Sequence, residues 1–470
     1  MRSLVSSLNN SRDLKMKLFH VADIHLGRKR LDGRLPDRDL FDAFRSIVET
    51  AIREEADVFL IAGDLFDRAQ VEPAHLQQAQ EVLRLLKING IPVIAIEGNH
   101  DKAFIHSNEQ TWVQFLAGEG LLILLRPSFT AEGAVLESWN EETKTGSCVE
   151  IGGVRFVGLG YLGAATPAKV RQIVSCLEKG PPIVMLLHAG PEYFVGEGGG
   201  FSPDDLAVLE ERVCYLALGH IHRPMLHGGW ACNPGSPENC ELREAAADRD
   251  KKGEVVHRGF ALIEIDPVRP EKPVKLDVRS NPRRPVHRAK LNCTPFGNKI
   301  KNGTEALVAA AVKAIAEFKP ASGDVVDLAL TGSLNLNRIA LDQNLAAAEI
   351  GRSAGIFAVA LDTTRLNIGD GLAGTNSADA ADIPRDELER RAIRELVEDH
   401  PLWELEEKRE DFAGFFYELK ETVRLGRTAD EIAGQIATNP LVEFIRTAKT
   451  APPPAHQVGA AANSLTEPAQ

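Results

Sequence analysis

The stretch KLFHVADIHLG (Lys17–Gly27) begins as an apolar, β-rich run and ends in two polar side chains, Asp23 and His25. Residues two apart in an extended segment point to the same side, so both side chains are expected to reach one ligand. Similar runs predict strands at Asp57–Asp64, Pro92–Gly98, Val149–Leu159, Ile183–His188, Cys214–Gly219 and Phe260–Ile265. Because helical patterns at Asp39–Glu55 and Pro73–Lys87 separate the early runs, the sequence predicts an α/β fold with a sheet core covered by helices.

Length and local composition predict several domains. A chain of 470 residues exceeds one ordinary hydrophobic core. The small second domain is suggested by an Ala-rich helix at Thr304–Phe318 and by strands at Val325–Leu330 and Ala358–Leu361. The expected segments are a disordered leader (1–15), a first domain (16–284), a small α/β domain (285–366), a linker (367–383), a helical region (384–450) and a disordered tail (451–470).

Composition and charge limit the class of protein. No apolar run reaches the ~18–20 residues that cross a bilayer, and the first residues lack the apolar centre of a secretory signal, so no membrane partner is expected. Six cysteines form no C-x-x-C pair and are expected to be reduced thiols, which favours a cytoplasmic location. The net charge of −13 at first argues against a nucleic-acid partner. However, residues 291–470 hold 18 Lys and Arg against 27 Asp and Glu, so the first 290 residues are nearly balanced.

Polar residues at the ends of the predicted strands form one set of candidate metal ligands, because strand ends fix loop residues around a crevice. The set is Asp23, His25, Asp64, Asn99, His188, His220 and His222. One partition gives Asp23, His25, Asp64 and His222 to one ion, and Asp64, Asn99, His188 and His220 to a second. Asp64 follows a glycine, which permits a sharp turn, and it is the candidate bridging carboxylate. Taken alone, His188 would suit a hydrogen-bonded core histidine better, and His20 within its apolar run is expected to be one.

The chemistry of this set points to hydrolysis of a phosphate ester. Mixed nitrogen and oxygen ligands without a thiolate suit Mn, Fe or Zn. Two ions ~3.5–4 Å apart can activate a bridging hydroxide and stabilise both the attacking and the leaving oxygen. His100 follows Asn99 directly, and it is expected to stabilise the developing charge or to protonate the leaving oxygen.

The motifs Asp23-Ile-His25, GDLFD (Gly63–Asp67), GNHD (Gly98–Asp101) and GHIH (Gly219–His222), together with His188, resemble the calcineurin-like metallophosphoesterase superfamily. The longer segments FHVADIHLG, AGDLFD, EGNHD, YLALGHIHRP and NPGSPENCELRE are similar to the SbcD family of double-strand-break repair nucleases, the Mre–Rad type. The resemblance is good over residues 16–270 and weaker over 286–365. It implies a two-sheet α/β/β/α sandwich with a small α/β capping domain and a helical C-terminal region.

The resemblance also implies a function. It implies a metal-dependent DNA nuclease that hydrolyses phosphodiesters at DNA ends, as exonuclease, endonuclease or both, in DNA repair or a related complex. Two divalent ions, preferably Mn with Mg, Fe or Zn possible, would be held by the seven candidate ligands. His100 would be the catalytic histidine. Asp67 is a second catalytic candidate, at a position where some family members have a phosphate-positioning histidine and others have Asp. The implied partners are DNA, a second copy of the chain, and an SbcC-like coiled-coil ATPase bound by residues 384–450. The implied location is cytoplasmic, with the nucleoid when DNA is bound.

Two basic clusters are candidate DNA contacts, since Arg and Lys contacts to phosphate dominate nucleic-acid affinity. Four of the residues follow the first ligands, and two lie at the expected domain junction: Arg28, Lys29, Arg30, Arg34, Arg283 and Arg284. Aspartates at 32, 37 and 39 are interleaved with the first cluster, so solvated surface charge is an equally good interpretation of it.

Two other functions stay open. A small-molecule, nucleotide-type phosphodiesterase would use the same metal site, although such enzymes rarely need some 180 further residues. GDLFDR superficially resembles the GDxxDRG of protein phosphatases, but Ala69 replaces the glycine and Asp101 stands where those enzymes have Glu. The last alternative is a non-catalytic DNA-end scaffold, and the intact ligand set argues against it.

Overall fold

The computed structural model describes residues 15–31, 35–102, 110–195, 199–248, 256–268, 272–297, 305–334, 342–368, 393, 408–424, 427 and 429–442. The chain forms two compact units. One contains the residues up to 291 with 307–331 and 344–365, and the other contains 292–306, 332–343 and the residues from 366 onward. Of the described helices, none is both long and apolar enough to cross a bilayer. Nearly all of the expected leader and linker, and the whole expected tail, lie outside the described residues, and the expected domain boundaries stay predictions.

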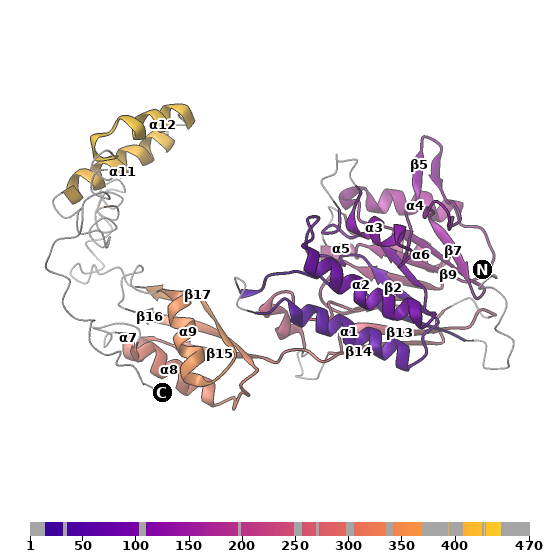
Figure 1. The fold of residues 1–470 in the computed structure, drawn as a ribbon, viewed down its shortest axis with the longest axis horizontal. Helices are drawn as coiled ribbons and strands as arrows, with labels where there is room; N and C mark the ends of the chain where they lie inside the picture. Colours follow the sequence, from indigo (N-terminus) through magenta and orange to yellow (C-terminus); the bar gives the residue numbers. More distant parts are fainter. Residues whose placement is uncertain are drawn as a thin grey trace, which may run out of the picture. The chain divides into compact units, whose positions relative to one another are not determined.

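The first of two six-stranded sheets contains the opening stretch of the chain (Figure 1). Its order is β14–β13–β1–β2–β3–β4, with β1 (Met16–Val21), β2 (Val58–Ala62), β3 (Val93–Ile96), β4 (Ile123–Leu124), β13 (Gly259–Ile265) and β14 (Lys275–Ser280). Strands β1 to β4 are parallel neighbours, whereas β13 is antiparallel to both β1 and β14. Strand β2 is buried at every position, which explains a continuous apolar run in place of an alternating one.

The second six-stranded sheet has the order β11–β12–β10–β9–β8–β7. Its strands are β7 (Cys148–Ile151), β8 (Val154–Leu159), β9 (Ile183–His188), β10 (Tyr215–Gly219), β11 (Met225–His227) and β12 (Ala231–Asn233). Strands β8, β9, β10 and β12 are parallel, and β7 and β11 close the edges in the antiparallel direction. Each sheet therefore has a parallel centre, so several strands end at the same edge.

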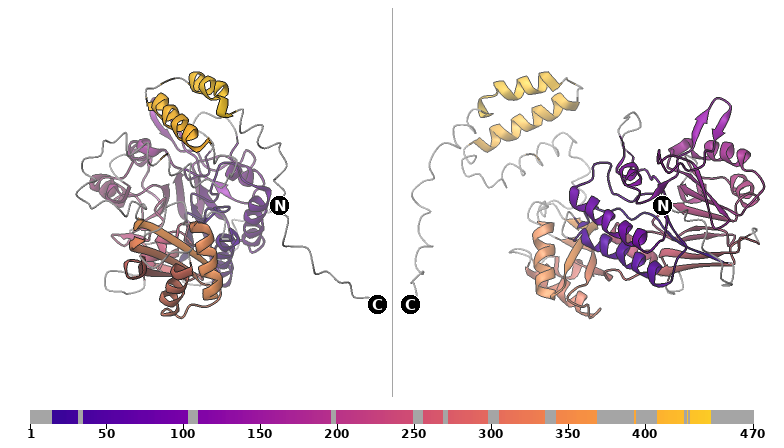
Figure 2. Two further views of the ribbon diagram at one scale, coloured as in Figure 1. Left: turned by 90° about the vertical axis from the view of Figure 1, so that its left-hand side faces the viewer. Right: turned by 45° about the vertical axis from the view of Figure 1, so that its right-hand side comes forward.

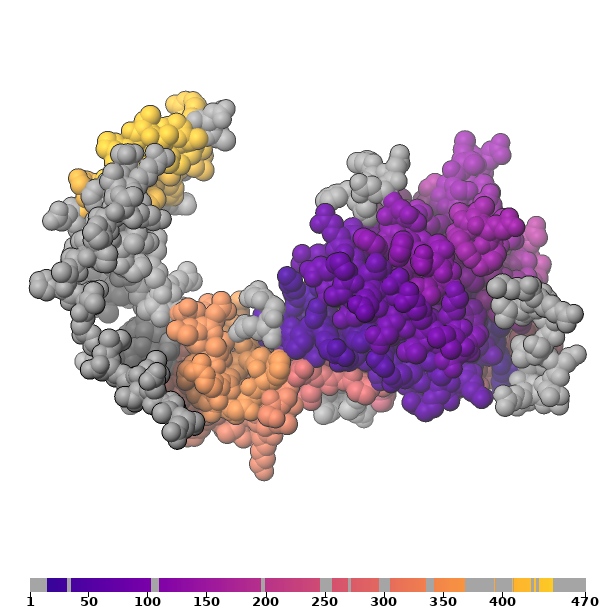
Figure 3. Space-filling model, viewed as in Figure 1, coloured from indigo at the N-terminus to yellow at the C-terminus, as the bar shows by residue number. Residues whose placement is uncertain are grey.

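Helices cover the outer faces of the two sheets. Side chains such as Leu60 and Ile94 from the first sheet pack against Leu186 and Tyr215 from the second, and this cluster forms the core between the sheets. The outer face of the first sheet packs on α1 (Arg38–Arg53), α2 (Pro73–Ile88) and α3 (Trp112–Gly118). The outer face of the second packs on α4 (Thr166–Cys176) and α6 (Pro203–Glu210). The expected α/β/β/α sandwich is confirmed, and Figure 3 shows its indigo-to-magenta part as one closely packed body.

One expected strand was wrong. Val149–Leu159 is two antiparallel strands, β7 and β8, joined at Gly152 and Gly153. Both glycines have positive φ values (56° and 77°), which glycine adopts readily and which a continuous strand excludes. The short pair β5 (Ser128–Thr130) and β6 (Gly133–Val135) forms a separate two-stranded sheet that the sequence did not suggest.

The remaining elements confirm that a smaller sheet and helices follow the sandwich in the sequence. A three-stranded sheet has the order β15 (Val286–Asn292), β16 (Val325–Leu334) and β17 (Ala358–Ile368), and the nearby sequence forms α7 (Thr294–Gly297), α8 (Glu305–Ala316) and α9 (Gln343–Ala354). Strands β16 and β17 both extend beyond the expected limits. Further along, α11 (Arg409–Arg424) and α12 (Ala429–Thr438) lie side by side (Figure 2).

Candidate metal centre

Strand ends from both sheets bring the seven candidate ligands together. Asp23, Asp64 and Asn99 follow the parallel strands β1, β2 and β3 of the first sheet. His188 is the last residue of β9, and it pairs in register with Gly219 at the end of β10, directly before His220. The side chains of Asp23, His25 and His188 are fully buried. The fold therefore brings these side chains together at one edge of the two sheets.

The sequence predicts an extended segment at Asp23 and His25. The structure differs, because the loop that carries them is not extended. Asp23, His25, Asp64 and His220 all have positive φ values, of 55°, 52°, 52° and 87°. Backbone hydrogen bonds maintain these turns, because the amides of Ile24 and His25 both donate to the carbonyl of Asp64, at 2.9 and 3.0 Å. Asp23 and His25 thus converge through two left-handed turns. Such turns cost about 1–3 kcal/mol each for residues with a side chain, and they concentrate at functional sites.

The glycines of the motifs allow the loops to approach one another. A Cβ atom on Gly98 would collide with the carboxylate of Asp64, and one on Gly63 would collide with the His188 ring. A Cβ on Gly219 would collide with the carbonyl of Ala62 at the end of β2. Two of the glycines therefore make room for a candidate ligand, and Gly219 lets the two sheets meet closely at this edge.

One group of side chains gathers between Asp64 and the second sheet. The Nε2 atom of His188 lies 3.2 Å from Asp64 Oδ2 and 3.2 Å from Asn99 Oδ1. The Nδ1 atom of His220 lies 3.0 Å from the same Asn99 oxygen. These four residues are the expected ligands of one ion.

A second group lies on the other side of Asp64. His25 Nε2 is 3.6 Å from Asp64 Oδ2 and 3.1 Å from His222 Nε2. The backbone amide of His220 donates to Asp23 Oδ1 at 2.9 Å, while Asp23 Oδ2 has no hydrogen-bond partner among the described residues. The same Asp64 oxygen is thus near both groups, as the expected bridging carboxylate requires.

The histidines are oriented as metal-binding histidines commonly are. His188 Nδ1 lies 2.8 Å from the Ala62 carbonyl, and His222 Nδ1 lies 2.7 Å from Glu244 Oε1. Because these oxygens only accept, Nδ1 carries the proton in each ring and Nε2 points into the site. Such outer contacts fix the tautomer of a ligating histidine. Together with the buried, unpartnered Asp23 oxygen, they show that the residues fit a pair of divalent ions.

The electrostatics of the site favour positive charge. Burial opposes a charge on His188, but the Asp64 carboxylate outweighs it and raises the pKa of His188 to about 9. Burial likewise opposes a charge on His222, but hydrogen bonds to Cys240 and Glu244 raise its pKa to about 11. The pKa of Asp64 lies far below its usual range, since His188 and His25 outweigh burial. A bound cation would supply the positive charge that these carboxylates stabilise.

His100 lies at the edge of the site, and Asp67 is close to it. The ring of His100 is 4.7 Å from that of His25 between centroids, and its Nδ1 lies 2.7 Å from the backbone carbonyl of Asp67. The Asp67 carboxylate is 3.0 Å from Arg28 Nη1 and 3.5 Å from His25 Nδ1. These contacts hold the pKa of Asp67 below its usual value against the effect of burial. Asp67 therefore orients its neighbours through both its backbone and its side chain.

Among the expected DNA-binding residues, two are engaged inside the protein. Arg30 pairs with Asp39 at 2.8 Å and is almost fully buried, and Arg284 pairs with the same carboxylate at 2.8 Å. These internal ion pairs engage both guanidinium groups, and the expectation that Arg30 and Arg284 contact phosphate stays a prediction. Arg34 lies outside the described residues, and Arg283 is half-buried.

A hollow of about 880 Å³ beside His100 is lined by charged side chains of both signs. Its six basic residues are Arg28, Lys29, Arg30, Arg68, Arg243 and Arg288, and its four acidic residues are Asp67, Glu241, Asp327 and Asp362. Lys29 is exposed, whereas Arg28 is tied to Asp67 and Glu241. Three of the expected residues, Arg28, Lys29 and Arg30, therefore lie next to the candidate site.

Three further residues shape the site, namely Asp101, Glu244 and Cys240, and none of them was predicted from the sequence to do so. The buried carboxylate of Asp101 accepts hydrogen bonds from the amides of Leu65, Phe66 and Gly98, at 2.9–3.3 Å. It thereby ties together the loops that carry Asp64 and Asn99. Glu244 orients His222, and the buried thiol of Cys240 lies near His25 and His222. The position of Asp101 within GNHD was a usable signal, but Glu244 and Cys240 follow no recognisable spacing.

Residues 16–224 match the sequence model of the calcineurin-like phosphoesterases. The chain is also similar to proteins described as DNA double-strand break repair protein Mre11. It is 29% identical to that of Archaeoglobus fulgidus over 257 residues, which cover 53% of this chain and 57% of the relative. It is 28% identical to that of Methanopyrus kandleri over 265 residues, which cover 53% and 54%. The chain thus spans little more than half the length of these relatives.

Solved structures with some likeness to the chain include TT1561 of Thermus thermophilus, with a TM-score of 0.31, 11% identity and coverage of 56% of this chain and 97% of that one. A dimetal phosphatase from Danio rerio gives a TM-score of 0.31 and 14% identity, and the match covers 53% and 92% of the two chains.

Proposed function

We propose that this protein is a two-metal DNA nuclease that hydrolyses phosphodiesters at DNA ends. The observation that carries the proposal is the position of Asp64, whose Oδ2 atom lies between His188 at 3.2 Å and His25 at 3.6 Å. One ion would be held by Asp23, His25, Asp64 and His222, and the other by Asp64, Asn99, His188 and His220. Mn is the preferred metal of the proposal, with Mg, Fe and Zn as alternatives.

The two ions, when bound, would supply a hydroxide nucleophile and neutralise charge on the phosphate. In the reaction, the oxygen of water bonds to phosphorus, the bond from phosphorus to the leaving oxygen breaks, and that oxygen takes up a proton. His100 is the residue proposed to assist there. Because its Nδ1 proton is donated to the Asp67 carbonyl, Nε2 is the nitrogen available to the phosphate or the leaving oxygen.

The choice of DNA as substrate is supported by the similarity to break-repair proteins and by the basic residues of the hollow beside His100. Lys29 and Arg68 are proposed to contact the DNA backbone, with Arg28 helping to position Asp67. A polyanionic substrate would meet several of these charges at once, whereas a single nucleotide would meet few. Binding should therefore weaken steeply with salt.

The proposal includes two protein partners: a second copy of the chain and an SbcC-like coiled-coil ATPase. The ATPase would bind the C-terminal helices, where Phe416, Val423 and Ile436 expose apolar side chains on α11 and α12. A pull-down with full-length chain and with a chain lacking residues 384–470 tests this, since retention of the ATPase by the shortened chain would refute the interface. The proposed location is the cytoplasm, at the nucleoid when DNA is bound.

A nuclease panel tests the proposed function. Purified protein is given labelled double-stranded, single-stranded and hairpin DNA, and cyclic nucleotides, each with Mn and with Mg. Cleavage of DNA is expected with Mn, and it should fall by at least about 100-fold in Asp64→Ala and in His100→Ala. The control is His257→Ala, which changes an exposed histidine bonded to Ser280. Unchanged cleavage in Asp64→Ala would refute the mechanism, and turnover of cyclic nucleotides alone would favour the small-molecule alternative.

A further inference from the structure

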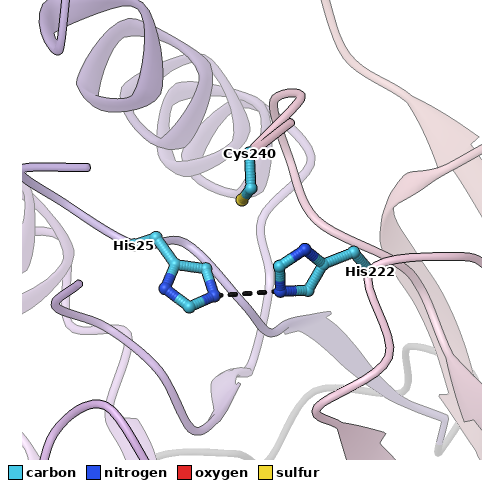
Figure 4. Close-up of side chains that lie close together, drawn as sticks. All are labelled: His25, His222 and Cys240. Atoms are coloured by element: carbon cyan, nitrogen blue, oxygen red, sulfur yellow. Dashed lines mark hydrogen bonds between the residues drawn. The ribbon is translucent and has the colours of Figure 1, made fainter. Parts of the chain in front are cut away.

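Cys240 completes a cluster of three possible ligands on one side of the metal centre. Ligand atoms of His25, His222 and Cys240 all lie within 4.8 Å of one another. His25 is fully buried and Cys240 is 2% exposed. Figure 4 shows the sulfur pointing toward the space between the two imidazole rings. His25 is 197 residues away from His222 in the sequence, so the fold brings it to the other two side chains.

The two imidazole rings face each other through their Nε2 atoms, within hydrogen-bonding distance. Their Nε2 atoms are 3.1 Å apart (Figure 4). The Nδ1 atom of His222 donates to Glu244, so in the neutral ring Nε2 carries a lone pair. The Nδ1 atom of His25 faces the Asp67 carboxylate at 3.5 Å, so Nε2 is the nitrogen that faces His222. One ion could therefore bind both Nε2 atoms while each Nδ1 keeps its own carboxylate neighbour.

The sulfur of Cys240 contacts two carbonyl groups and the His222 ring. Its Sγ atom lies 3.9 Å from the carbonyl oxygens of both Asp23 and Glu238, and it is hydrogen-bonded to the ring of His222, a proposed ligand. Metal–sulfur and metal–nitrogen bonds of about 2.3 and 2.0–2.1 Å allow two ligand atoms of one ion to be up to about 4.4 Å apart. Separations within 4.8 Å therefore need only a small side-chain rotation to fit a shared ion.

Glu244 couples the cysteine to the histidine. One carboxylate oxygen is 2.7 Å from His222 Nδ1, and the other accepts the backbone N–H of Cys240 at 2.9 Å. Arg28 adds a positive group on the same side, since its Nε donates to the Cys240 carbonyl at 3.1 Å. The position of the thiol is therefore fixed by the same carboxylate that orients a proposed ligand.

We propose that Cys240 Sγ is a further ligand of the ion held by His25 and His222, and that it gives this half of the centre a preference for Zn, Fe or Co over Mn. The inference rests on the proposed two-metal function, and for this one ion it replaces the preference for Mn. On binding, the metal–sulfur bond forms and the thiol proton passes to solvent, with no change in oxidation state. A thiolate is a soft ligand and favours these metals over Mn, so the expectation of an oxygen and nitrogen site without a thiolate would be wrong here.

The test is a Co²⁺ titration of the full chain under anaerobic conditions, followed by absorption spectroscopy. A Co–thiolate bond gives a charge-transfer band in the near ultraviolet, in addition to the visible bands of any bound Co²⁺. The wild type should show this band, and Cys240→Ser should lose it while keeping the visible bands. The matched control is Cys232→Ser, because Cys232 is equally buried but lies beside Tyr215 in the core. Its charge-transfer band should be unchanged.

The outcomes separate the two proposals. If the wild type binds Co²⁺ with visible bands but without a charge-transfer band, the cysteine ligand is refuted and the metal centre stands. If no Co²⁺ binds at all, the proposed function fails as well. If Cys240→Ser does not fold, X-ray absorption of the Zn-loaded wild type decides, since absence of sulfur in the zinc shell refutes the proposal. In folded Cys240→Ser the ratio of Zn to Mn affinity should fall by roughly 10–100-fold, and an unchanged ratio would contradict the preference.

Discussion

Replacing Glu244 should lower the affinity for one ion of the proposed pair and leave the affinity for the other unchanged. Its carboxylate accepts from His222 Nδ1 at 2.7 Å and from the Cys240 amide at 2.9 Å. In Glu244→Ala the His222 ring loses its orientation and its fixed tautomer. Loss of such an outer contact costs about 10–100-fold in metal affinity, which corresponds to about 1.4–2.7 kcal/mol of binding free energy. The ion at His188 and His220 has its own outer contact, at the Ala62 carbonyl, and should bind as before.

The assay is a calorimetric titration of metal-free protein with Mn²⁺ or Zn²⁺, fitted to two sites. Because Glu244→Ala also leaves a buried amide without a partner, it should lower the free energy of unfolding by about 1–3 kcal/mol. Urea unfolding of the metal-free protein measures that part separately. Glu241→Ala is the matched control, since Glu241 is on the same loop but pairs with Arg28 and Arg243. Two unchanged affinities in folded Glu244→Ala, or an equal loss at both sites, would refute the reasoning.

Two further predictions concern the buried histidine and a motif glycine. Burial lowers the pKa of His20 from 6.5 to about 3, so the unfolded chain takes up a proton below pH 6.5 that the folded chain refuses. Stability should fall by about 1.4 kcal/mol per pH unit between pH 6.5 and 3 through this residue. The glutamine in His20→Gln can still form a hydrogen bond with Tyr215. Between neutral pH and pH 5, the free energy of unfolding measured in urea should fall by about 2 kcal/mol less in this variant than in the wild type. An identical pH dependence in the two proteins would contradict the lowered pKa of His20. Gly98→Ala should place a methyl group against the Asp64 carboxylate. Thermal unfolding should then show a loss of about 1–3 kcal/mol in the free energy of unfolding, and metal titration should show a lower affinity for both ions. Metal binding equal to wild type would mean that the two loops can separate freely.

The sequence predicts the layers well because the central strands are buried on both faces. Strands such as β2 and β9 are continuous apolar runs, and their polar ends mark one edge of the sheets. His20 was correctly expected to be a core histidine, since its Nδ1 lies 2.8 Å from the Tyr215 hydroxyl. The same reasoning failed at Val149–Leu159, where two glycines turn the chain inside an apolar run.

The finer structure of the site could not be predicted from spacing. Left-handed turns at Asp23 and Asp64 depend on backbone hydrogen bonds between two loops, which no local pattern reveals. Glu244 and Cys240 reach His222 only because the loop after β12 folds back over it. The charge cluster around Arg30 was ambiguous in sequence, because its ion pair with Asp39 can be seen only in the fold. Residues that contact a motif from elsewhere in the chain could therefore be identified only from the fold.

The left-handed residues of the metal centre have a consequence for the lifetime of the protein in a cell. Four residues with side chains hold positive φ values there, and each turn costs about 1–3 kcal/mol. Without ions, the same loops also hold several carboxylates close together. Ions that bind only the folded chain would offset both costs by mass action. A cell that runs short of metal would then lose this protein to proteolysis as its loops open, and would need to synthesise it again before activity could return.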